Sequence, residues 1–240
     1  MKPIIGITCA WSEETWGNSS DGEGYYYVGR PYAEAVTKCG GIPMMIPPSY
    51  INEDLHEMID RILSCVNGLI FSGGGDAKRF SPAEFPTLEE QQPRRYYFES
   101  ELLKEASKRN IPVLGICRGH QMIAEVFGGS ISKELIDGHK QNLPGYKPWH
   151  EVSIEAKSKM SDITGIHNWR VNSFHRQVVE KVPEGFIASI KADGGTIEAI
   201  ESIDHTFFIG LQFHPEELMR FDKPSELIIK CLIENAKISR

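Results

Sequence analysis

Short apolar runs alternate with amphipathic stretches over the first half of the chain. Runs of four to five apolar residues bounded by Gly or Pro are typical of buried strands, and apolar residues at 3.6-residue spacing are typical of helices. The pattern predicts strands at Ile4–Thr8, Ile42–Ile46, Gly68–Phe71 and Ile111–Leu114, and helices at Arg30–Lys38, Leu55–Val66, Phe98–Ala106 and Met122–Phe127. Repeated strand–helix pairs of this length predict an α/β fold with an open, mostly parallel sheet flanked by helices.

From about Ser130 the pattern changes to short apolar segments joined by turns. The segments predicted as strands are Glu151–Ile154, Arg170–Val171, Gly185–Lys191, Thr196–Ser202 and Thr206–Gln212. Their spacing favours antiparallel additions to the sheet in the C-terminal half, followed by a closing helix at Ser225–Lys237. Because no repeat or linker interrupts the chain, we expect residues 1–240 to form a single domain.

Two long segments without a clear periodic pattern are predicted as loops. Ala10–Val28 is rich in aromatic residues, with Trp11 and Trp16 among them, and Asp76–Pro93 contains three prolines before Arg94. Loops of this length in a compact domain often cover a functional site, although they can also be surface padding. The aromatic residues of the first loop favour a cover that touches a ligand.

The segment Gly115–Gly119 joins a predicted strand directly to a predicted helix, with Cys117 at its centre. Such a turn strains the central residue, and small neighbours two positions away on each side let the backbone pass. The G-x-S-x-G elbow of serine hydrolases meets the same steric demand with oxygen in place of sulfur. The partial positive charge at this helix N-terminus favours the thiolate form of the cysteine. The alternative is an inert, buried cysteine that acts as a small apolar residue.

A second chemical signal follows the apolar run Phe207–Phe213, which ends in His214-Pro215-Glu216. A thiol nucleophile needs a base within hydrogen-bond reach, and the base needs a third group to fix its tautomer. His214 and Glu216 project to the same side of an extended chain because they are two residues apart. Each alone could be structural or merely solvated. Together with the elbow cysteine they predict a Cys117–His214–Glu216 triad.

Acyl transfer also needs hydrogen-bond donors for a developing oxyanion. The backbone N–H of Arg118 follows the predicted nucleophile at the helix N-terminus, and the run Ser72–Asp76 at the end of a neighbouring strand can turn another N–H inward, since glycine tolerates the required φ. A phosphate-binding loop is the rival interpretation of this run. It is set aside because no Gly-Lys-Ser/Thr follows.

Charge and cysteine content narrow the function classes. The net charge of −7 without a basic stripe argues against nucleic-acid and anionic-membrane partners. The 5 cysteines contain no C-x-x-C pair, which suits a reducing compartment, and the N-terminal run is too short for a signal peptide. We therefore expect a cytoplasmic protein, and leave a homodimer open. Of the cysteines, Cys117 alone is expected to be exposed and reactive.

The motifs together resemble a known family. Gly115–Gln121 with His214–Glu216 resembles the class I glutamine amidotransferase-like fold, and within it peptidase family C26, in the subgroup typified by γ-glutamyl-γ-aminobutyrate hydrolases. Further similar motifs are the Tyr32–Pro47 segment with its Gly-Gly-Ile-Pro, Gly68–Asp76, Val171–His175 and Gln212–Glu216. The resemblance spans nearly the whole chain and implies a flavodoxin-like sheet.

The resemblance also implies a reaction and a set of site residues. Cys117 would attack the γ-carbonyl of a glutamyl amide, His214 would carry the proton to the departing amine, and water would hydrolyse the glutamyl thioester. Glu216 would orient His214, and Gly74 or Gly75 would act with Arg118 as oxyanion donors. The positions similar to those that grip the glutamyl α-amino and α-carboxylate groups are Gln121, Asn172, Ser173, Phe174 and His175. No cofactor is implied.

One departure from the family pattern concerns Tyr96. Relatives commonly show Arg-Asp before the Phe-Glu that opens the following helix, whereas here Tyr96 and Tyr97 follow Arg95. An aromatic residue in place of the carboxylate would alter a charge near the mouth of the site. Leaving-group preference is therefore expected to differ from that of the typical member.

Metal binding is not predicted from the sequence. The candidates His139, His150, His167 and His175 have a spacing that fits no standard zinc arrangement. A thiol hydrolase also needs no metal, so we expect none. His175 is the histidine of this set expected to line the pocket.

Three functions remain in competition. The first is a stand-alone hydrolase of small γ-glutamyl amines such as γ-glutamyl-GABA, and the two long loops favour it. The second is a glutaminase module that delivers ammonia to a partner synthetase. The third is a non-catalytic relative, which would be expected to lack Cys117, His214 or Glu216, yet all three are present.

Overall fold

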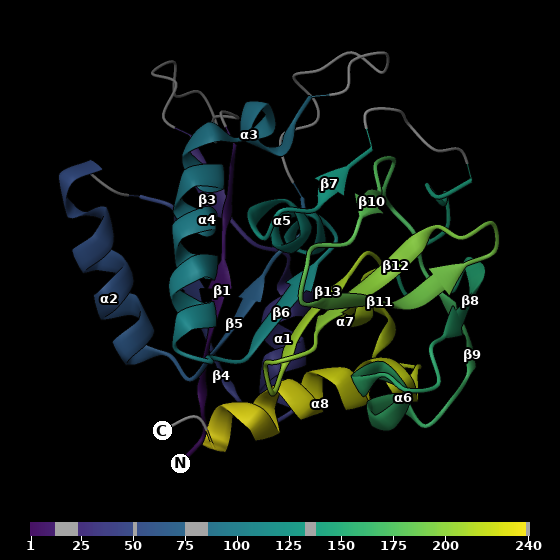
Figure 1. Ribbon diagram of the computed structural model, residues 1–240. Coiled ribbons are helices and arrows are strands. Elements are labelled where there is room, and N and C mark those ends of the chain that lie inside the picture. The colour runs from purple at the N-terminus through teal and green to yellow at the C-terminus, as the bar shows by residue number, and fades with distance from the viewer. Residues whose placement is uncertain (13–23, 50–51, 75–85, 133–137, 239–240) are drawn as a thin grey trace, which may run out of the picture.

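The computed structural model describes residues 1–12, 24–49, 52–74, 86–132 and 138–238, which form an 11-stranded sheet, a separate two-stranded sheet and flanking helices (Figure 1). The large sheet has the order β4-β1-β5-β6-β13-β12-β11-β8-β9, with β10 paired to β12 and β7. Its strands are β1 (Ile4–Thr8), β4 (Ile42–Ile46), β5 (Gly68–Phe71), β6 (Val113–Ile116), β7 (Ser130–Ile131), β8 (His150–Ile154), β9 (Asn168–Val171), β10 (Val179–Lys181), β11 (Phe186–Ala192), β12 (Ile197–Ser202) and β13 (Phe208–Leu211).

Parallel pairing holds the first five strands of this order together, from β4 to β13. From β13 onwards, β12, β11, β8 and β9 pair antiparallel. The predicted α/β fold with a mostly parallel sheet and antiparallel additions is thus confirmed. The expectation that Thr206–Gln212 is an antiparallel addition holds on one side only, because β13 pairs antiparallel with β12 but runs parallel to β6, with Phe208 opposite Val113. The antiparallel β12 reverses the chain just before it.

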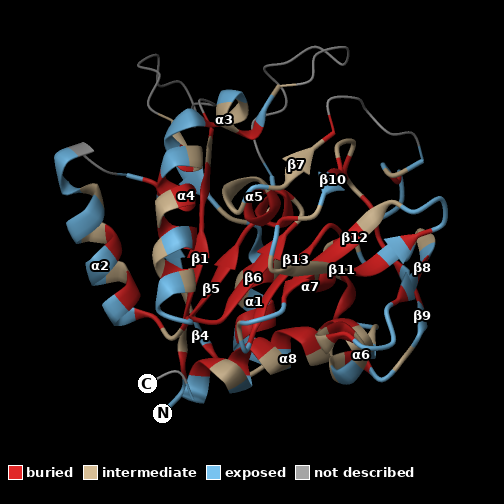
Figure 2. Ribbon diagram, viewed as in Figure 1, coloured by how far each residue is buried: buried red, intermediate tan, exposed pale blue. Residues whose placement is uncertain are grey.

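Helices cover both faces of the sheet because successive strand residues point to opposite sides. Ile70 and Leu114 pack toward α1 (Arg30–Lys38) and α8 (Lys223–Ile238), whereas Leu69 and Val113 pack toward α2 (Leu55–Cys65), α4 (Pro93–Lys108) and α5 (Arg118–Val126). The central strands are buried throughout (Figure 2). The short helices are η1 (Asn52–Asp54), α3 (Leu88–Gln91), α6 (Lys159–Thr164) and α7 (Pro215–Leu218). No helix in the described ranges is both long and apolar enough to cross a membrane.

The two predicted loops are partly structured. The first contains an antiparallel pair, β2 (Ala10–Ser12) with β3 (Tyr25–Tyr27), and the second contains α3. The centres of both segments, residues 13–23 and 75–85, lie outside the described residues. Their proposed role as covers, and Trp16 with it, therefore stays a prediction.

The order of the strands determines where an active site can form. In a parallel sheet, ligand sites form beyond the carboxyl ends of the strands. The neighbours β5, β6 and β13 end at Phe71, Ile116 and Leu211, immediately before Ser72, Cys117 and Gln212. Segments that lie about 45 and 95 residues apart along the chain therefore meet at one edge, close in space because adjacent strands are roughly 5 Å apart.

Candidate active site

Cys117 occupies the strained turn between β6 and α5. Its backbone has φ 53° and ψ −102°, a conformation that non-glycine residues rarely adopt. Its N–H donates to Leu211 O at 2.7 Å, which fixes the turn against β13. The flanking glycines are required by contact: a Cβ at position 115 would lie 2.5 Å from Gly119 O, and one at position 119 would lie 2.1 Å from Phe71 O.

His214 and Glu216 lie beyond the end of β13, with His214 Nδ1 2.7 Å from Glu216 Oε1. Glu216 is buried and His214 is largely covered. His214 reaches the elbow, since a Cβ placed on Gly73 would lie 3.0 Å from His214 Cε1 and 3.2 Å from Cys117 Cβ, and Glu216 is joined to the site through His214. The structure therefore brings the three residues of the predicted triad together around Gly73.

The charge state of His214 follows from these neighbours. Burial by itself would lower the pKa of His214, but the Glu216 carboxylate and Cys117 together hold that pKa well above its usual value. An imidazolium is thus favoured beside the cysteine. This is the electrostatic setting in which a thiolate is stabilised and reactive.

Tyr32, on α1, is a site residue that sequence reasoning missed. Its hydroxyl accepts a hydrogen bond from Gly73 N–H at 2.9 Å and lies close enough to the Glu216 carboxylate to feel its charge. Burial, followed by the nearby Glu216 charge, raises the pKa of Tyr32 well above its usual value, so the hydroxyl keeps its proton. Tyr32 therefore ties the glycine run after β5 to the acid that holds His214.

Arg95 holds the backbone carbonyls of the glycine run after β5. Its guanidinium donates to Ser72 O at 2.7 Å and to Gly74 O at 2.9 Å, with Gly73 O at 3.4 Å from both terminal nitrogens. Since a trans peptide points its C=O and N–H in opposite directions, carbonyls held toward Arg95 turn the following N–H groups away from it. Gly73 N–H is engaged by Tyr32, which leaves Gly74 N–H, at φ +76°, as the candidate oxyanion donor in the described part of this run. Gly75 lies outside the described residues.

Arg95 belongs to a fully buried ion network. Glu99 Oε1 accepts from Arg95 Nε at 2.8 Å and from the Thr8 hydroxyl at 2.6 Å, and Glu99 Oε2 accepts from Arg118. Burial would raise the pKa of Glu99, but the two guanidiniums outweigh burial and lower it. The Arg118 side chain thus anchors the start of α5, while its backbone N–H is one of the first of that helix, next to Cys117.

Two of the residues expected to bind substrate are engaged within the protein. Asn172 is fully buried, its Oδ1 accepts from His214 N–H at 2.8 Å, and its Nδ2 donates to His214 O at 3.0 Å and to Gly145 O at 2.7 Å. Ser173 is also buried, donates its hydroxyl to His139 O, and receives a hydrogen bond at its backbone oxygen from Gln141 N–H. In this arrangement Asn172 holds the backbone of His214.

The other three residues expected to bind substrate lie in different places relative to the triad. The half-buried Phe174 ring meets the His214 ring edge-on, with centroids 5.7 Å apart, so Phe174 lines the site. Gln121 donates its amide to Gln177 O at 2.8 Å and to the Gln212 side chain at 3.1 Å. His175 is buried and turns away from the triad toward Glu198 on β12, with 3.4 Å between His175 Nε2 and Glu198 Oε1.

Tyr96 connects helix α4 to helix α5. Its hydroxyl donates to Glu125 Oε1 at 3.1 Å, and its ring packs against the cluster between α4, α5 and the sheet. Burial, followed by Glu125, raises the pKa of Tyr96 to about 12, so the hydroxyl stays neutral. These contacts explain the presence of an aromatic residue by packing between α4 and α5.

Cysteine reactivity gives a direct test of the elbow. The expectation that only Cys117 is exposed is wrong, because Cys65 at the end of α2 is exposed and Cys117 is half-buried. We nevertheless expect iodoacetamide to modify Cys117 first, since the His214 imidazole lies beside its sulfur. Cys65 should follow at the rate of an ordinary thiol. Cys9 should be last, because burial raises its pKa to about 11.

Time-resolved peptide mass spectrometry at neutral pH measures this order. A His214→Gln variant is the control, because Cys117 should then react no faster than Cys65. Equal rates for Cys117 and Cys65 in the unaltered protein would contradict an activated thiol.

Comparison with known proteins agrees with this geometry. The family model described as Peptidase C26 matches residues 3–216. The chain is 28% identical to a Rickettsia prowazekii protein named "putative glutamine amidotransferase-like protein", over 98% of both chains. It is 26% identical to the gamma-glutamyl-gamma-aminobutyrate hydrolase of Escherichia coli, over 90% of this chain and 86% of that one.

A solved structure extends the comparison to the fold. The crystal structure of a glutamine amidotransferase from Thermotoga maritima superposes with a TM-score of 0.61 at 17% identity, covering 99% of this chain and 97% of that one. The class I glutamine amidotransferase-like fold expected from the motifs is confirmed. The match of the family model over most of the chain gives the assignment: this protein belongs to the peptidase C26 family of glutamine amidotransferase-like hydrolases.

Proposed function

We propose that the protein hydrolyses the γ-glutamyl amide bond of a small γ-glutamyl amine. The observation that carries the proposal is the meeting of a strained elbow cysteine with the hydrogen-bonded pair His214–Glu216 at Gly73. A nucleophile, a base and a group that orients the base are the parts that acyl transfer requires. The similarity to a γ-glutamyl-γ-aminobutyrate hydrolase supports the choice of substrate class.

In the proposed reaction, Cys117 Sγ attacks the γ-carbonyl carbon of the glutamyl group. The developing oxyanion receives hydrogen bonds from the backbone N–H groups of Arg118 and Gly74. His214, held by Glu216, gives its proton to the amine nitrogen as the C–N bond breaks. The amine leaves, and a glutamyl thioester remains on Cys117.

Water completes the cycle. His214 accepts a proton from water, the hydroxide formed attacks the thioester carbon, and the C–S bond breaks to release glutamate and the Cys117 thiolate. Recognition of the glutamyl group is assigned to Gln121 and Phe174, which border the triad segments, and not to Asn172, whose amide holds His214. None of these steps uses a cofactor or a second protein.

A glutaminase that delivers ammonia to a synthetase is the second candidate, favoured by the name of the Rickettsia relative. The chemistry is the same, with ammonia as the leaving group. The two candidates differ in substrate and in dependence on a partner. Purified full-length protein offered γ-glutamyl-GABA, other γ-glutamyl amines and free glutamine separates them by the glutamate released.

We expect turnover of at least one γ-glutamyl amine at a kcat/KM well above that for glutamine. A preference for glutamine, or activity that appears only on adding a synthetase, would replace the proposal by the glutaminase. A protein inert toward every compound, with Cys117 shown to be reduced, would contradict both hydrolytic functions.

A further inference from the structure

A second cluster of ionisable groups lies outside the triad, around Glu198 on β12. The Glu198 carboxylate is fully buried. Its Oε1 lies 3.2 Å from His139 Nδ1, 3.5 Å from His150 Nε2 and 3.4 Å from His175 Nε2. The three histidines come from separate segments, namely the loop before β8, the first residue of β8 and the segment after β9.

The polar atoms of this cluster lack satisfied hydrogen bonds. Both Glu198 oxygens, His139 Nδ1, His150 Nε2 and His175 Nε2 are buried, and none of them makes a hydrogen bond of acceptable geometry within the described structure. A buried carboxylate is costly unless it is paired, as Glu198 is with these imidazoles when they are protonated, or coordinates a metal. The three imidazole nitrogens converge on one carboxylate oxygen at ion-pair distance, an arrangement that also suits a shared metal ion.

His175 sharpens this conclusion. Its Nδ1 lies 3.2 Å from Gln177 O, and since a carbonyl only accepts, Nδ1 carries the hydrogen. Nε2, on the other side of the ring, lies 3.4 Å from Glu198 Oε1, in a side chain only 1% exposed. Histidines that bind metals commonly donate their other N–H to a backbone carbonyl in this way.

The two distances from Glu198 to His139 and His150 match the edge of a tetrahedral site. Zinc binds imidazole nitrogen and carboxylate oxygen at roughly 2.0–2.2 Å, which sets the edges of a ligand tetrahedron at about 3.3–3.5 Å. The distances from Glu198 Oε1 to His139 and His150 are 3.2 and 3.5 Å. One ligand atom each from His139, His150 and Glu198 all lie within 4.8 Å of one another.

We propose that His139, His150 and Glu198 bind one divalent transition-metal ion, best matched by zinc, with His175 beside the remaining coordination position. Two imidazoles and a carboxylate are a ligand set that zinc uses with a fourth, open position. The sequence pattern did not predict this site, because Glu198 and the histidines belong to segments that only the fold brings together. The proposal does not depend on the reaction at Cys117.

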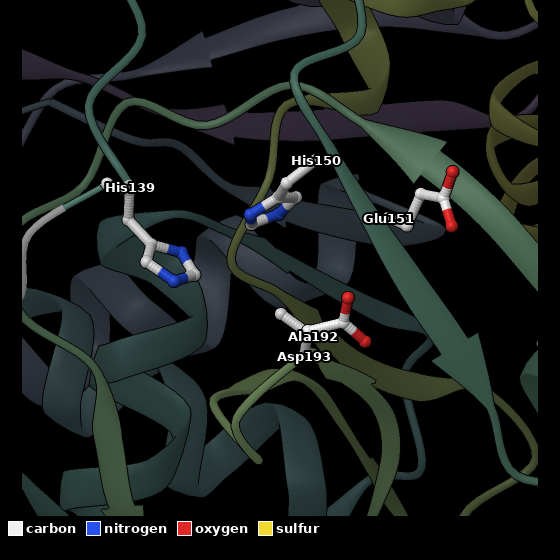
Figure 3. Close-up of a pocket in the computed structure, with 6 residues that line it drawn as sticks. His139, His150, Glu151, Ala192 and Asp193 are labelled. Carbon is white, nitrogen blue, oxygen red and sulfur yellow. The ribbon is translucent and has the colours of Figure 1, made fainter.

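A pocket provides the route for the ion. It has a volume of about 180 Å³ and is lined by Gly138, His139, His150, Glu151, Ala192 and Asp193. Figure 3 shows the His139 and His150 imidazoles turned toward the same space from two separate segments; their ring centroids lie 4.7 Å apart. The carboxylates of Glu151 and Asp193 add negative charge along the entrance, which favours entry of a cation.

The bound ion would join β8, β12 and the loop before β8. Ser173 and Phe174 adjoin this cluster in the chain, and Phe174 packs on the His214 ring. The ion would therefore act as a structural cross-link beside the segment that positions His214. Its removal should loosen the antiparallel half of the sheet.

Zinc titration of the full chain, stripped with a chelator and then dialysed free of it, tests the proposal. We expect one Zn²⁺ bound per chain by calorimetry and elemental analysis, and a rise in Tm of roughly 5–10 °C at free zinc about 100 times Kd. Co²⁺ should give the visible absorption of a tetrahedral N/O site without a thiolate charge-transfer band. The Cys117→Ser variant should bind equally, which separates this site from the nucleophile.

Matched variants identify the ligands. Glu198→Gln and His150→Ala should each lower zinc affinity by at least 100-fold, whereas His167→Ala, a change to an exposed histidine outside the cluster, should not change it. Circular dichroism shows whether each variant is folded. His139→Asn, at the rim of the cluster, gives the same test if Glu198→Gln does not fold. The absence of stoichiometric zinc binding in the unaltered protein, or its persistence in folded ligand variants, would overturn the proposal.

Discussion

Replacing Cys117 by serine should lower kcat for a γ-glutamyl amide by roughly 10⁴- to 10⁶-fold, the range found when a covalent nucleophile is removed from a triad. Serine nearly keeps the size of the side chain. Its hydroxyl, however, is not ionised beside His214 at neutral pH and is therefore a much weaker nucleophile. KM should change by less than about tenfold, since Cys117 attacks the substrate and does not hold the glutamyl group. Steady-state kinetics with glutamate detection measures both.

The matched control is Cys65→Ser, an exposed cysteine at the end of α2. Its activity should equal that of the unaltered protein, and the Tm of both variants should lie within about 2 °C of it, because neither change creates a cavity or buries a new polar group. If Cys117→Ser kept more than a tenth of the activity, the thioester mechanism would have to be abandoned.

The parallel half of the fold could be predicted because local pattern and tertiary environment agree there. Gly68–Phe71 is buried on both faces, so it appears as a continuous apolar run, and Gly or Pro marks the ends of the helices and strands around it. Arg30–Lys38 was predicted with its observed bounds. The direction of β13 was not, because an apolar run records burial and not which neighbouring strand it will pair with.

The residues of the candidate site were likewise predicted only in part. Cys117, His214 and Glu216 lie in motifs with local signatures, and these motifs supplied all three. Tyr32 and Asn172 also lie in segments that resemble the family, but their observed roles were not predicted, since those roles depend on contacts 41 and 42 residues away in the chain.

Buried charges were the largest gap. Arg95 is completely buried, although a charged residue on a helix is ordinarily expected at the surface. Only the fold shows that Glu99 neutralises it and that its remaining donors hold the carbonyls of Ser72–Gly74. Glu198 was not predicted as a site residue either, because a polar residue in a strand of alternating pattern is expected to face solvent.

The elbow glycines lead to the prediction with the largest effect on stability. Gly119→Ala should lower the free energy of unfolding by at least about 3 kcal/mol, equivalent to a fall in Tm of roughly 6–12 °C. Alanine is otherwise favoured over glycine inside a helix, by about 1 kcal/mol, so propensity alone predicts the opposite sign. The new Cβ would lie 2.1 Å from Phe71 O and 2.9 Å from Phe71 Cβ. The backbone and Cβ atoms of Phe71 on β5 cannot yield without separating α5 from the sheet, so the clash decides the sign.

Gly29→Ala is the control for this substitution. A Cβ at position 29 meets neighbours no closer than 3.5 Å, and Gly29 has φ −59°, which alanine adopts without strain. Its cost should stay near 1 kcal/mol, from the weaker N-cap of α1. Urea unfolding of both variants gives the comparison, and equal m-values would show that the native state alone has changed. A Gly119→Ala protein as stable as Gly29→Ala would mean that α5 does not pack on β5 this closely, and the strained position of Cys117 would lose its structural basis.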